Sequence, residues 1–250
     1  MSTKVHLLDS GTLVIDRSQM LWNIDCGTPV RFPVYSVLVE HEKGLFLFDT
    51  GYDLEHVEKV LPFEQPIQSQ QQTIPEQLKL AGFEPGDVDY VINSHLHFDH
   101  VGGNKYLTEA TTLIHKQELR HGKVPEPFER LGYSDLGFDY PGVKYDLLEG
   151  DIKLADGLWL YQTPGHTAGH YSMLVELEKD RNMLFAGDAC YSQENLEKEV
   201  IAGFHLDPTD SVRSIKRLKR LADEHDADIY GAHDAESFKN FKLAPDHYGG

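Results

Sequence analysis

Short apolar runs alternate with polar stretches along the whole chain, and Gly, Pro and Asp stand between the runs. Runs of about four to eight residues bounded by such turn-forming residues are typical of strands. Two hairpins are predicted near the start of the chain, one from residues 4–8 and 12–15 and one from residues 34–40 and 45–49. Further strands are predicted at residues 90–93, 112–115, 143–148, 158–162, 171–177, 183–186 and 228–232.

Helical spacing of apolar positions is clearest in residues 211–225, where Lys and Arg occupy the opposite face. The apolar positions of that face are Val212, Ile215, Leu218, Leu221 and Ala222. Residues 74–80 are predicted to form another helix, because Thr73 can cap it and Pro75 stands in its first turn. A short helix is expected near residues 116–121.

The order of these elements predicts one domain over residues 1–250, because no repeat, low-complexity run or linker interrupts them. Many strands with a few helices between them favour an α/β fold in which helices cover two packed sheets, an αββα sandwich. Apolar residues make up 40% of the chain, which is enough for a sizeable core.

The charge balance narrows the classes of partner. The formal net charge is −18, so the surface repels phosphate backbones and anionic lipids, and we expect neither a nucleic-acid nor a membrane partner. The first residues do not form a signal peptide pattern, and no apolar run approaches the roughly 20 residues that span a bilayer. With only Cys26 and Cys190, the sequence predicts a reduced, cytoplasmic protein.

The strongest chemical signal directly follows the strand predicted at residues 90–93. Four potential metal ligands lie within six residues there: His95, His97, Asp99 and His100. His95 and His97 are two apart, so in extended chain they point to the same side and can bind one ion. Asp99 and His100 can then turn toward a second ion. Imidazole nitrogen and carboxylate oxygen suit zinc, although manganese, iron or cobalt would also fit.

Three later segments have the same form, an apolar strand followed closely by a ligand-type residue next to a small one. They are residues 158–162 before His166, residues 183–186 before Asp188, and residues 229–230 before His233. Each residue taken alone has an ordinary structural explanation, as a turn residue, a cap or a core histidine. Taken with the first cluster, the set predicts a metal site built from distant segments.

These motifs resemble those of the metallo-β-lactamase superfamily over nearly the whole chain. The matching residues are Asp49-Thr50-Gly51, the cluster from His95 to His100, Pro164-Gly165-His166, Gly187-Asp188 and His233. The resemblance implies the metallo-β-lactamase fold and two metal ions. It places one ion on His95, His97 and His166, the other on Asp99, His100 and His233, and Asp188 between them.

Within the superfamily the chain looks most like the lactonases, a branch that contains the N-acyl homoserine lactone lactonases and 4-pyridoxolactonase. Residues 94–100 and 163–170 carry this resemblance, together with Tyr191 three residues after Asp188. Residues 31–40, 49–68 and 127–138 look closest to 4-pyridoxolactonase. The expected activity is hydrolysis of a lactone ester by a hydroxide bridging two Zn²⁺ ions.

We expect the substrate to be 4-pyridoxolactone or a similar small lactone, with an N-acyl homoserine lactone as the alternative. A glyoxalase II-like thioesterase and a zinc-stabilised binding module without catalysis are further alternatives. The first would need basic residues for glutathione, and the second would normally have lost ligands. The oligomeric state cannot be predicted from these patterns.

Catalytic roles are expected for Asp99, as carrier of the proton to the leaving oxygen, and for Tyr191, as a donor to the developing oxyanion. His170 and Cys190 are expected to support the site rather than to bind metal. Asp49 is expected to hold the nearby loop by hydrogen bonds.

The pocket is expected to be lined by residues 52–72 and 122–142. Neither segment contains a continuous apolar stripe, which favours a small polar substrate. Phe63, Phe138 and Phe204 are candidates for the pocket walls, although packing in the core is the favoured reading of each.

Overall fold

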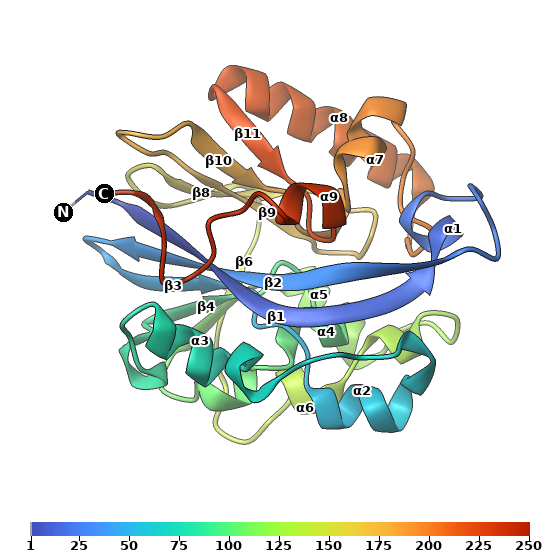
Figure 1. Ribbon diagram of the computed structural model, residues 1–250, viewed down its shortest axis with the longest axis horizontal. Coiled ribbons are helices and arrows are strands. Elements are labelled where there is room, and N and C mark those ends of the chain that lie inside the picture. Colours follow the sequence, from blue (N-terminus) through green and yellow to red (C-terminus); the bar gives the residue numbers. More distant parts are fainter. Residues whose placement is uncertain (1) are drawn as a thin grey trace.

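Two β-sheets packed face to face form the centre of the molecule, which the computed structural model describes for residues 2–250 (Figure 1). The first sheet has the order β12 (Tyr248–Gly249), β1 (Lys4–Asp16), β2 (Pro29–His41), β3 (Gly44–Phe48), β4 (Tyr90–Ile92), β5 (Thr111–His115), β6 (Lys144–Leu148). The second has the order β11 (Ala227–Tyr230), β10 (Asn182–Phe185), β9 (Tyr171–Val175), β8 (Leu158–Gln162), β7 (Ile152–Ala155).

Helices cover the outer faces of both sheets. Figure 1 shows α2, α3 and α6 on the outer side of the first sheet, and α7 and α8 on the outer side of the second. The helices are α1 (Arg17–Met20), α2 (Leu54–Val60), α3 (Ile74–Leu80), α4 (Phe98–Val101), α5 (Lys116–Lys123), α6 (Asp135–Phe138), α7 (Gln193–Lys198), α8 (Pro208–Glu224) and α9 (Ala235–Phe238). The predicted αββα sandwich is therefore confirmed. Within residues 2–250 there is no helix of the length and apolar character that crossing a bilayer requires.

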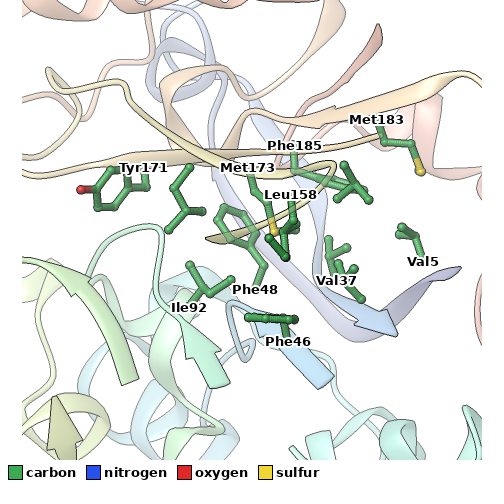
Figure 2. Packing of buried hydrophobic residues seen from close by; sticks show 14 of the residues in the cluster. Val5, Val37, Phe46, Phe48, Ile92, Leu158, Tyr171, Met173, Met183 and Phe185 are labelled. Carbon is green, nitrogen blue, oxygen red and sulfur yellow. The ribbon is translucent and has the colours of Figure 1, made fainter. Parts of the chain in front are cut away.

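The main hydrophobic core lies between the two sheets (Figure 2). Phe48 and Ile92 reach it from the first sheet, and Leu158, Met173 and Phe185 reach it from the second, all of them buried. Full burial of one such side chain contributes about 1.5–3 kcal/mol. The alternating inward positions of the strands thus hold the two sheets together, and with them the loops at the sheet edges.

One predicted hairpin is wrong. Residues 4–8 and 12–15 belong to a single strand, β1, and both halves pair with β2. The register shifts between Asp9 and Thr12, so the extra residues form a bulge instead of a turn. Gly11 has a φ of +97°, and an added Cβ there would lie 2.5 Å from the Ile67 carbonyl oxygen. The glycine read as a turn signal is therefore a bulge residue.

The other strong local predictions are confirmed. Residues 34–40 and 45–49 lie in the hairpin of β2 and β3, and the helix predicted at residues 74–80 is α3. The helix predicted at residues 211–225 is α8, which begins three residues earlier, where Asp207 caps it. α2, α7 and β7 were not predicted, because their segments show no clear pattern of apolar positions.

The strand directions bring four loops to one place. β3, β4, β5 and β6 run parallel to one another, and β10 runs parallel to β11. β8 and β10 are both antiparallel to β9 and so run in the same direction as each other. The carboxyl ends of β8, β10 and β11 therefore lie at one edge of the second sheet, facing the loop that follows β4.

Candidate metal centre

Two adjoining groups of ligand-type side chains lie where these loops meet. The first group is His95, His97, His166 and Asp188, and the second is Asp99, His100 and His233. Within each group, one nitrogen or carboxylate oxygen from every residue lies within 4.8 Å of the others. The structure thus brings together all seven residues that the sequence singled out as metal ligands.

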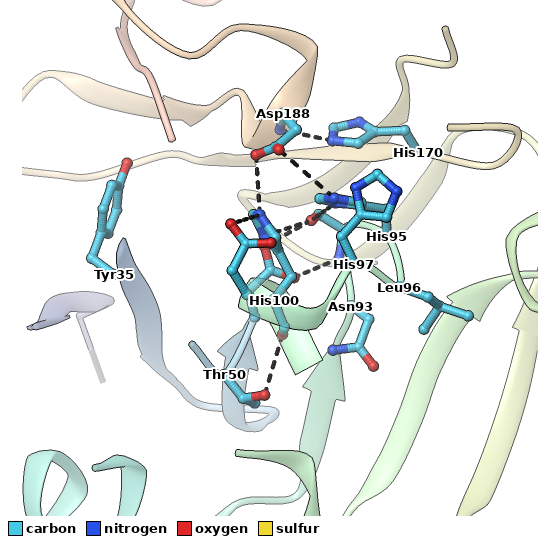
Figure 3. Close-up of polar contacts among 12 residues, drawn as sticks. Tyr35, Thr50, Asn93, His95, Leu96, His97, His100, His170 and Asp188 are labelled. Atoms are coloured by element: carbon cyan, nitrogen blue, oxygen red, sulfur yellow. Dashed lines mark hydrogen bonds and ion pairs between the residues drawn. The ribbon is translucent and has the colours of Figure 1, made fainter. Parts of the chain in front are cut away.

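Asp188 lies between the two groups and faces both (Figure 3). Its Oδ2 is 3.3 Å from His166 Nε2 and 3.8 Å from His95 Nε2. Its Oδ1 is 3.1 Å from His100 Nε2 and 3.2 Å from His233 Nε2. One carboxylate therefore presents one oxygen to each group, which is the arrangement needed to bridge two cations.

The chain turn after β4 separates the first cluster into its two halves. His97 is the N-cap residue of α4, and Asp99 and His100 lie inside that short helix. His95 and His97 precede the helix and reach the first group, whereas Asp99 and His100 turn to the second. The sequence predicted this division, but it did not predict a helical turn as its cause.

Four of the five imidazoles are held by a hydrogen bond at Nδ1, which leaves Nε2 free to face the centre. The pairs are His95 with Ser94 Oγ (2.9 Å), His100 with Asp49 Oδ2 (2.7 Å), His166 with the Phe204 carbonyl (2.8 Å) and His233 with the Pro33 carbonyl (3.0 Å). His97 instead presents Nδ1, 2.9 Å from His166 Nε2.

Asp49 supports both groups at once, as the sequence analysis expected. Its carboxylate accepts hydrogen bonds from the Ser94 amide and hydroxyl, each at 2.7 Å, and from His100 Nδ1. Asp49 itself has a φ of +58°, a left-handed conformation that aims its side chain back at the loop after β4. The anchoring role predicted for this residue is confirmed.

Glu118 of α5 supports the first group and was missed by the sequence analysis. It is fully buried, and its two carboxylate oxygens accept hydrogen bonds from the amides of Leu96 (3.1 Å) and Gly169 (2.9 Å). These amides belong to the loops that carry His95, His97 and His166. A single acidic residue in a short predicted helix gave no signal of this link.

His170 and Cys190 lie beside the centre but in neither group, as expected. His170 Nε2 accepts the amide of Asp188 at 2.9 Å, and its Nδ1 contacts Thr163 Oγ1 at 2.9 Å. Burial, followed by the charge of His166, lowers the pKa of His170 to about 3. Cys190 is buried and its thiol donates to the Ser192 carbonyl.

The two groups differ in charge. Burial lowers the pKa of His95, His97 and His166, so these imidazoles are neutral. Burial also disfavours the charged form of His100 and His233, but the nearby carboxylates, Asp188 first, outweigh it and raise the pKa of both. Burial disfavours the carboxylate form of Asp188 as well, yet the histidines around it hold its pKa well below the usual range.

The donor set fits a pair of zinc ions. His95 Nε2, His100 Nε2 and Asp188 Oδ1 are buried and have no hydrogen-bond partner among residues 2–250. Buried polar atoms without a partner are costly, so their convergence on common points indicates a ligand. Imidazole nitrogen with carboxylate oxygen is the donor chemistry that zinc prefers.

A cavity of about 210 Å³ opens above the centre. Its floor consists of His97, Asp99, His166, Asp188, Tyr191 and His233. Tyr191 is buried, and its ring centroid is 4.9 Å from that of His233. Burial, and then the charges of Asp188 and Asp99, raises the pKa of Tyr191 well above its usual range, so the hydroxyl keeps its proton.

The walls of this cavity are mainly apolar, which contradicts the expectation of a polar pocket. They include Ile15, Phe32, Leu61, Phe63, Phe98, Phe128, Leu131 and Phe204. Residues 52–72 and 122–142 do contribute to the walls, as predicted, but their isolated apolar side chains combine with those of other segments. Phe63 and Phe204 line the cavity, whereas Phe138 is fully buried against Leu96 and Val101.

The fold and the two ligand groups define a dinuclear metallohydrolase, and comparison with known proteins agrees. The family model described as the metallo-beta-lactamase superfamily matches residues 29–233. The chain therefore belongs to the metallo-β-lactamase superfamily, and it is a hydrolase with a two-zinc site.

Relatives and solved structures match over almost the full length. The chain is 33% identical to the N-acyl homoserine lactonase AttM of Agrobacterium fabrum and 34% identical to the N-acyl homoserine lactonase of Bacillus cereus, over 98% of each partner in both comparisons. A solved structure of an N-acyl homoserine lactone hydrolase, with the product N-hexanoyl-L-homoserine bound at its catalytic metal centre, matches with a TM-score of 0.88 and 32% identity, over 99% of both chains. The similarity to superfamily lactonases noted from the motifs is confirmed.

Proposed function

We propose that this protein opens the lactone ring of N-acyl homoserine lactones by hydrolysis. The observation that carries the proposal is the similarity, over 98% of the chain, to relatives described as N-acyl homoserine lactonases. The convergence of seven ligand-type side chains and Tyr191 on the floor of one cavity supports it. A small-molecule lactone is thus the proposed partner.

We assign the ligands as the sequence motifs suggested. His95, His97 and His166 would hold one ion, Asp99, His100 and His233 would hold the other, and Asp188 would bridge them. When bound, the two zinc ions polarise the ester carbonyl and supply hydroxide near neutral pH. The neutral imidazoles of the first group are already in the protonation state that binding requires.

Tyr191 is the proposed donor to the ester carbonyl oxygen. Its hydroxyl lies at the cavity floor and remains protonated, so it can donate a hydrogen bond as negative charge develops on that oxygen. A donor fixed in a buried site stabilises such a transition state without having to reorient.

Asp99 is the proposed proton carrier. Its Oδ2 is 3.6 Å from both His100 Nε2 and His233 Nε2, and the residue also lines the cavity. It can accept the proton of the attacking hydroxide once that oxygen has bonded to the carbonyl carbon, and pass it to the ring oxygen as the C–O bond breaks. The products are then a carboxylate and a hydroxyl group on one open chain.

The apolar walls favour an acylated lactone over a small polar one. The expectation of 4-pyridoxolactone was based on the resemblance of residues 31–40, 49–68 and 127–138 to 4-pyridoxolactonase, and on the lack of a continuous apolar stripe in the pocket segments. The walls of the cavity are mainly apolar, which does not support that expectation. An aliphatic acyl chain would instead bury its surface against Phe32, Leu61 and Phe204, at about 25 cal/mol per Å².

The test is to measure kcat/KM of the zinc-loaded protein for N-hexanoyl-homoserine lactone, N-decanoyl-homoserine lactone and 4-pyridoxolactone in parallel. We expect the acyl homoserine lactones to be preferred, and activity to disappear on chelation and return with zinc. Tyr191→Phe should reduce kcat by about 10- to 100-fold with full zinc content. Faster turnover of 4-pyridoxolactone, or no turnover of any lactone, would contradict the proposal.

A further inference from the structure

Glu64 places a carboxyl group in the apolar part of the cavity. It ends the 3₁₀ turn Pro62–Glu64, lines the cavity wall, and is only 5% exposed. Its backbone amide donates to the Leu61 carbonyl, but no hydrogen bond from residues 2–250 reaches its side-chain oxygens. Glu64 is therefore a buried acid without a partner in the protein.

The other acidic side chains around this cavity are all engaged. Asp99 and Asp188 lie among the imidazoles of the two ligand groups, and Glu129 is paired with His121. Glu64 differs because its surroundings in the wall are mainly apolar, with Phe63 directly before it in the chain and Leu61 three residues before it.

An unpartnered buried carboxyl destabilises the protein unless a ligand supplies its partner. Burial, and then the charge of Asp99, raises the pKa of Glu64 to about 8. Either protonation form can bind an amide: the carboxylate accepts from an N–H, and the protonated acid can also donate to a carbonyl oxygen.

We propose that Glu64 is a specificity-determining residue that forms a hydrogen bond with the secondary amide joining the acyl chain to the lactone ring. This inference rests on the proposed function. The ester of such a substrate would lie at the metal ligands and Tyr191, and its acyl chain would pack against the apolar walls. The amide is the one polar group of the substrate that remains, and Glu64 is the one carboxyl of the described walls with neither a hydrogen bond nor an ion pair.

The test compares two substrates that differ only in this amide. N-hexanoyl-homoserine lactone is paired with α-heptyl-γ-butyrolactone, which has the same ring and a chain of equal length but no amide. The quantity measured is the ratio of kcat/KM for the first substrate to that for the second, in the zinc-loaded protein.

Glu64→Met should lower this ratio by about 10-fold or more, since a site built to bind a polar group loses that bond while apolar contacts persist. Glu64→Gln should lower it by less than about 3-fold, because the carboxamide keeps a donor and an acceptor. Glu58→Leu, at an exposed glutamate of α2, is the matched control and should keep the wild-type ratio. Zinc content is measured for every variant.

A second measurement needs no variant of the protein. With the wild-type protein, methylation of the amide nitrogen of N-hexanoyl-homoserine lactone should reduce kcat/KM by about 10-fold or more, because the N–H is lost. An equal ratio in Glu64→Met and wild type, or full activity on the methylated substrate, would overturn the role of Glu64 and leave the lactonase proposal intact. No turnover of N-hexanoyl-homoserine lactone by the wild type would overturn the proposed function itself.

Discussion

The two halves of the metal centre contain similar ligand types, but the pKa values of their histidines are shifted in opposite directions. The first half presents the imidazoles of His95, His97 and His166, whose pKa values are lowered by burial. In the second half, carboxylates surround His100 and His233 and raise the pKa of both. Asp188 contributes one oxygen to each half.

This difference indicates how each half exchanges protons for metal. The imidazoles of the first half are neutral before an ion arrives, so they have no protons to release when it binds. The second half holds protons on its histidines, which offset the negative charge of the carboxylates, and these protons must leave as the ion binds. The two proposed ions are therefore expected to respond differently to mutation and to pH.

The largest effect is expected from Asp188→Ala, which removes the residue common to both halves. We expect both ions to bind weakly, and kcat/KM to fall by about 10³-fold or more, because the hydrolysis depends on the metal pair. Metal analysis of the purified variant together with lactone kinetics checks this. A variant that keeps two zinc ions per chain would show that Asp188 does not bridge.

The next largest effect is expected from variants that disrupt only one half of the centre. His166→Ala and His233→Ala should each remove about one zinc ion per chain and lower kcat/KM by about 10²- to 10³-fold. The pair serves as its own control, since each variant leaves the opposite half complete. Loss of both ions from either variant would mean that the halves do not bind independently.

Glu118→Gln should have a smaller effect, confined to the first half. One carboxylate oxygen that ties the ligand loops becomes an amide donor facing a backbone amide, so the loops lose a hydrogen bond. We expect a 10- to 100-fold loss in affinity for one ion, with the other unchanged. Glu109→Gln, at an exposed glutamate, is the control, and equal weakening of both ions would contradict this role.

The mildest test is acidification. Because His100 and His233 have a raised pKa, protons compete for their nitrogens at a higher pH than in the first half. As the pH falls, the second half should release its ion first, at a midpoint pH higher than that of the first half. A chromophoric chelator can follow release from His166→Ala, which retains the second half, and from His233→Ala, which retains the first. Equal midpoint pH values for the two halves, or release from the first half at the higher pH, would contradict the proposed difference between them.

The sequence singled out side chains that the structure brings together, because they follow strands whose apolar pattern is local. His95, His166, Asp188 and His233 all stand within a few residues of a strand end, and strand direction alone brings such ends together. The predicted sandwich came from the same alternation, since inward-facing apolar positions define the core between the sheets.

The rest depended on contacts between distant residues, for which one sequence carries no signal. Glu118 acts through amides about 22 and 51 positions away, and any buried acid in a helix would look the same. The bulge at Gly11 looked like a turn because both need a positive φ, and only pairing with β2 distinguishes them. The apolar cavity was missed because its walls come from many separate segments.

Finally, the proposed ligands are divided between the two sheets. His95, His97, Asp99 and His100 follow a strand of the first sheet, whereas His166, Asp188 and His233 follow strands of the second. Each ion would therefore be coordinated by residues from both sheets and would cross-link the two layers of the sandwich. Metal binding then adds directly to the free energy of unfolding. Chelation is therefore expected to weaken the association of the two sheets as well as to abolish the activity.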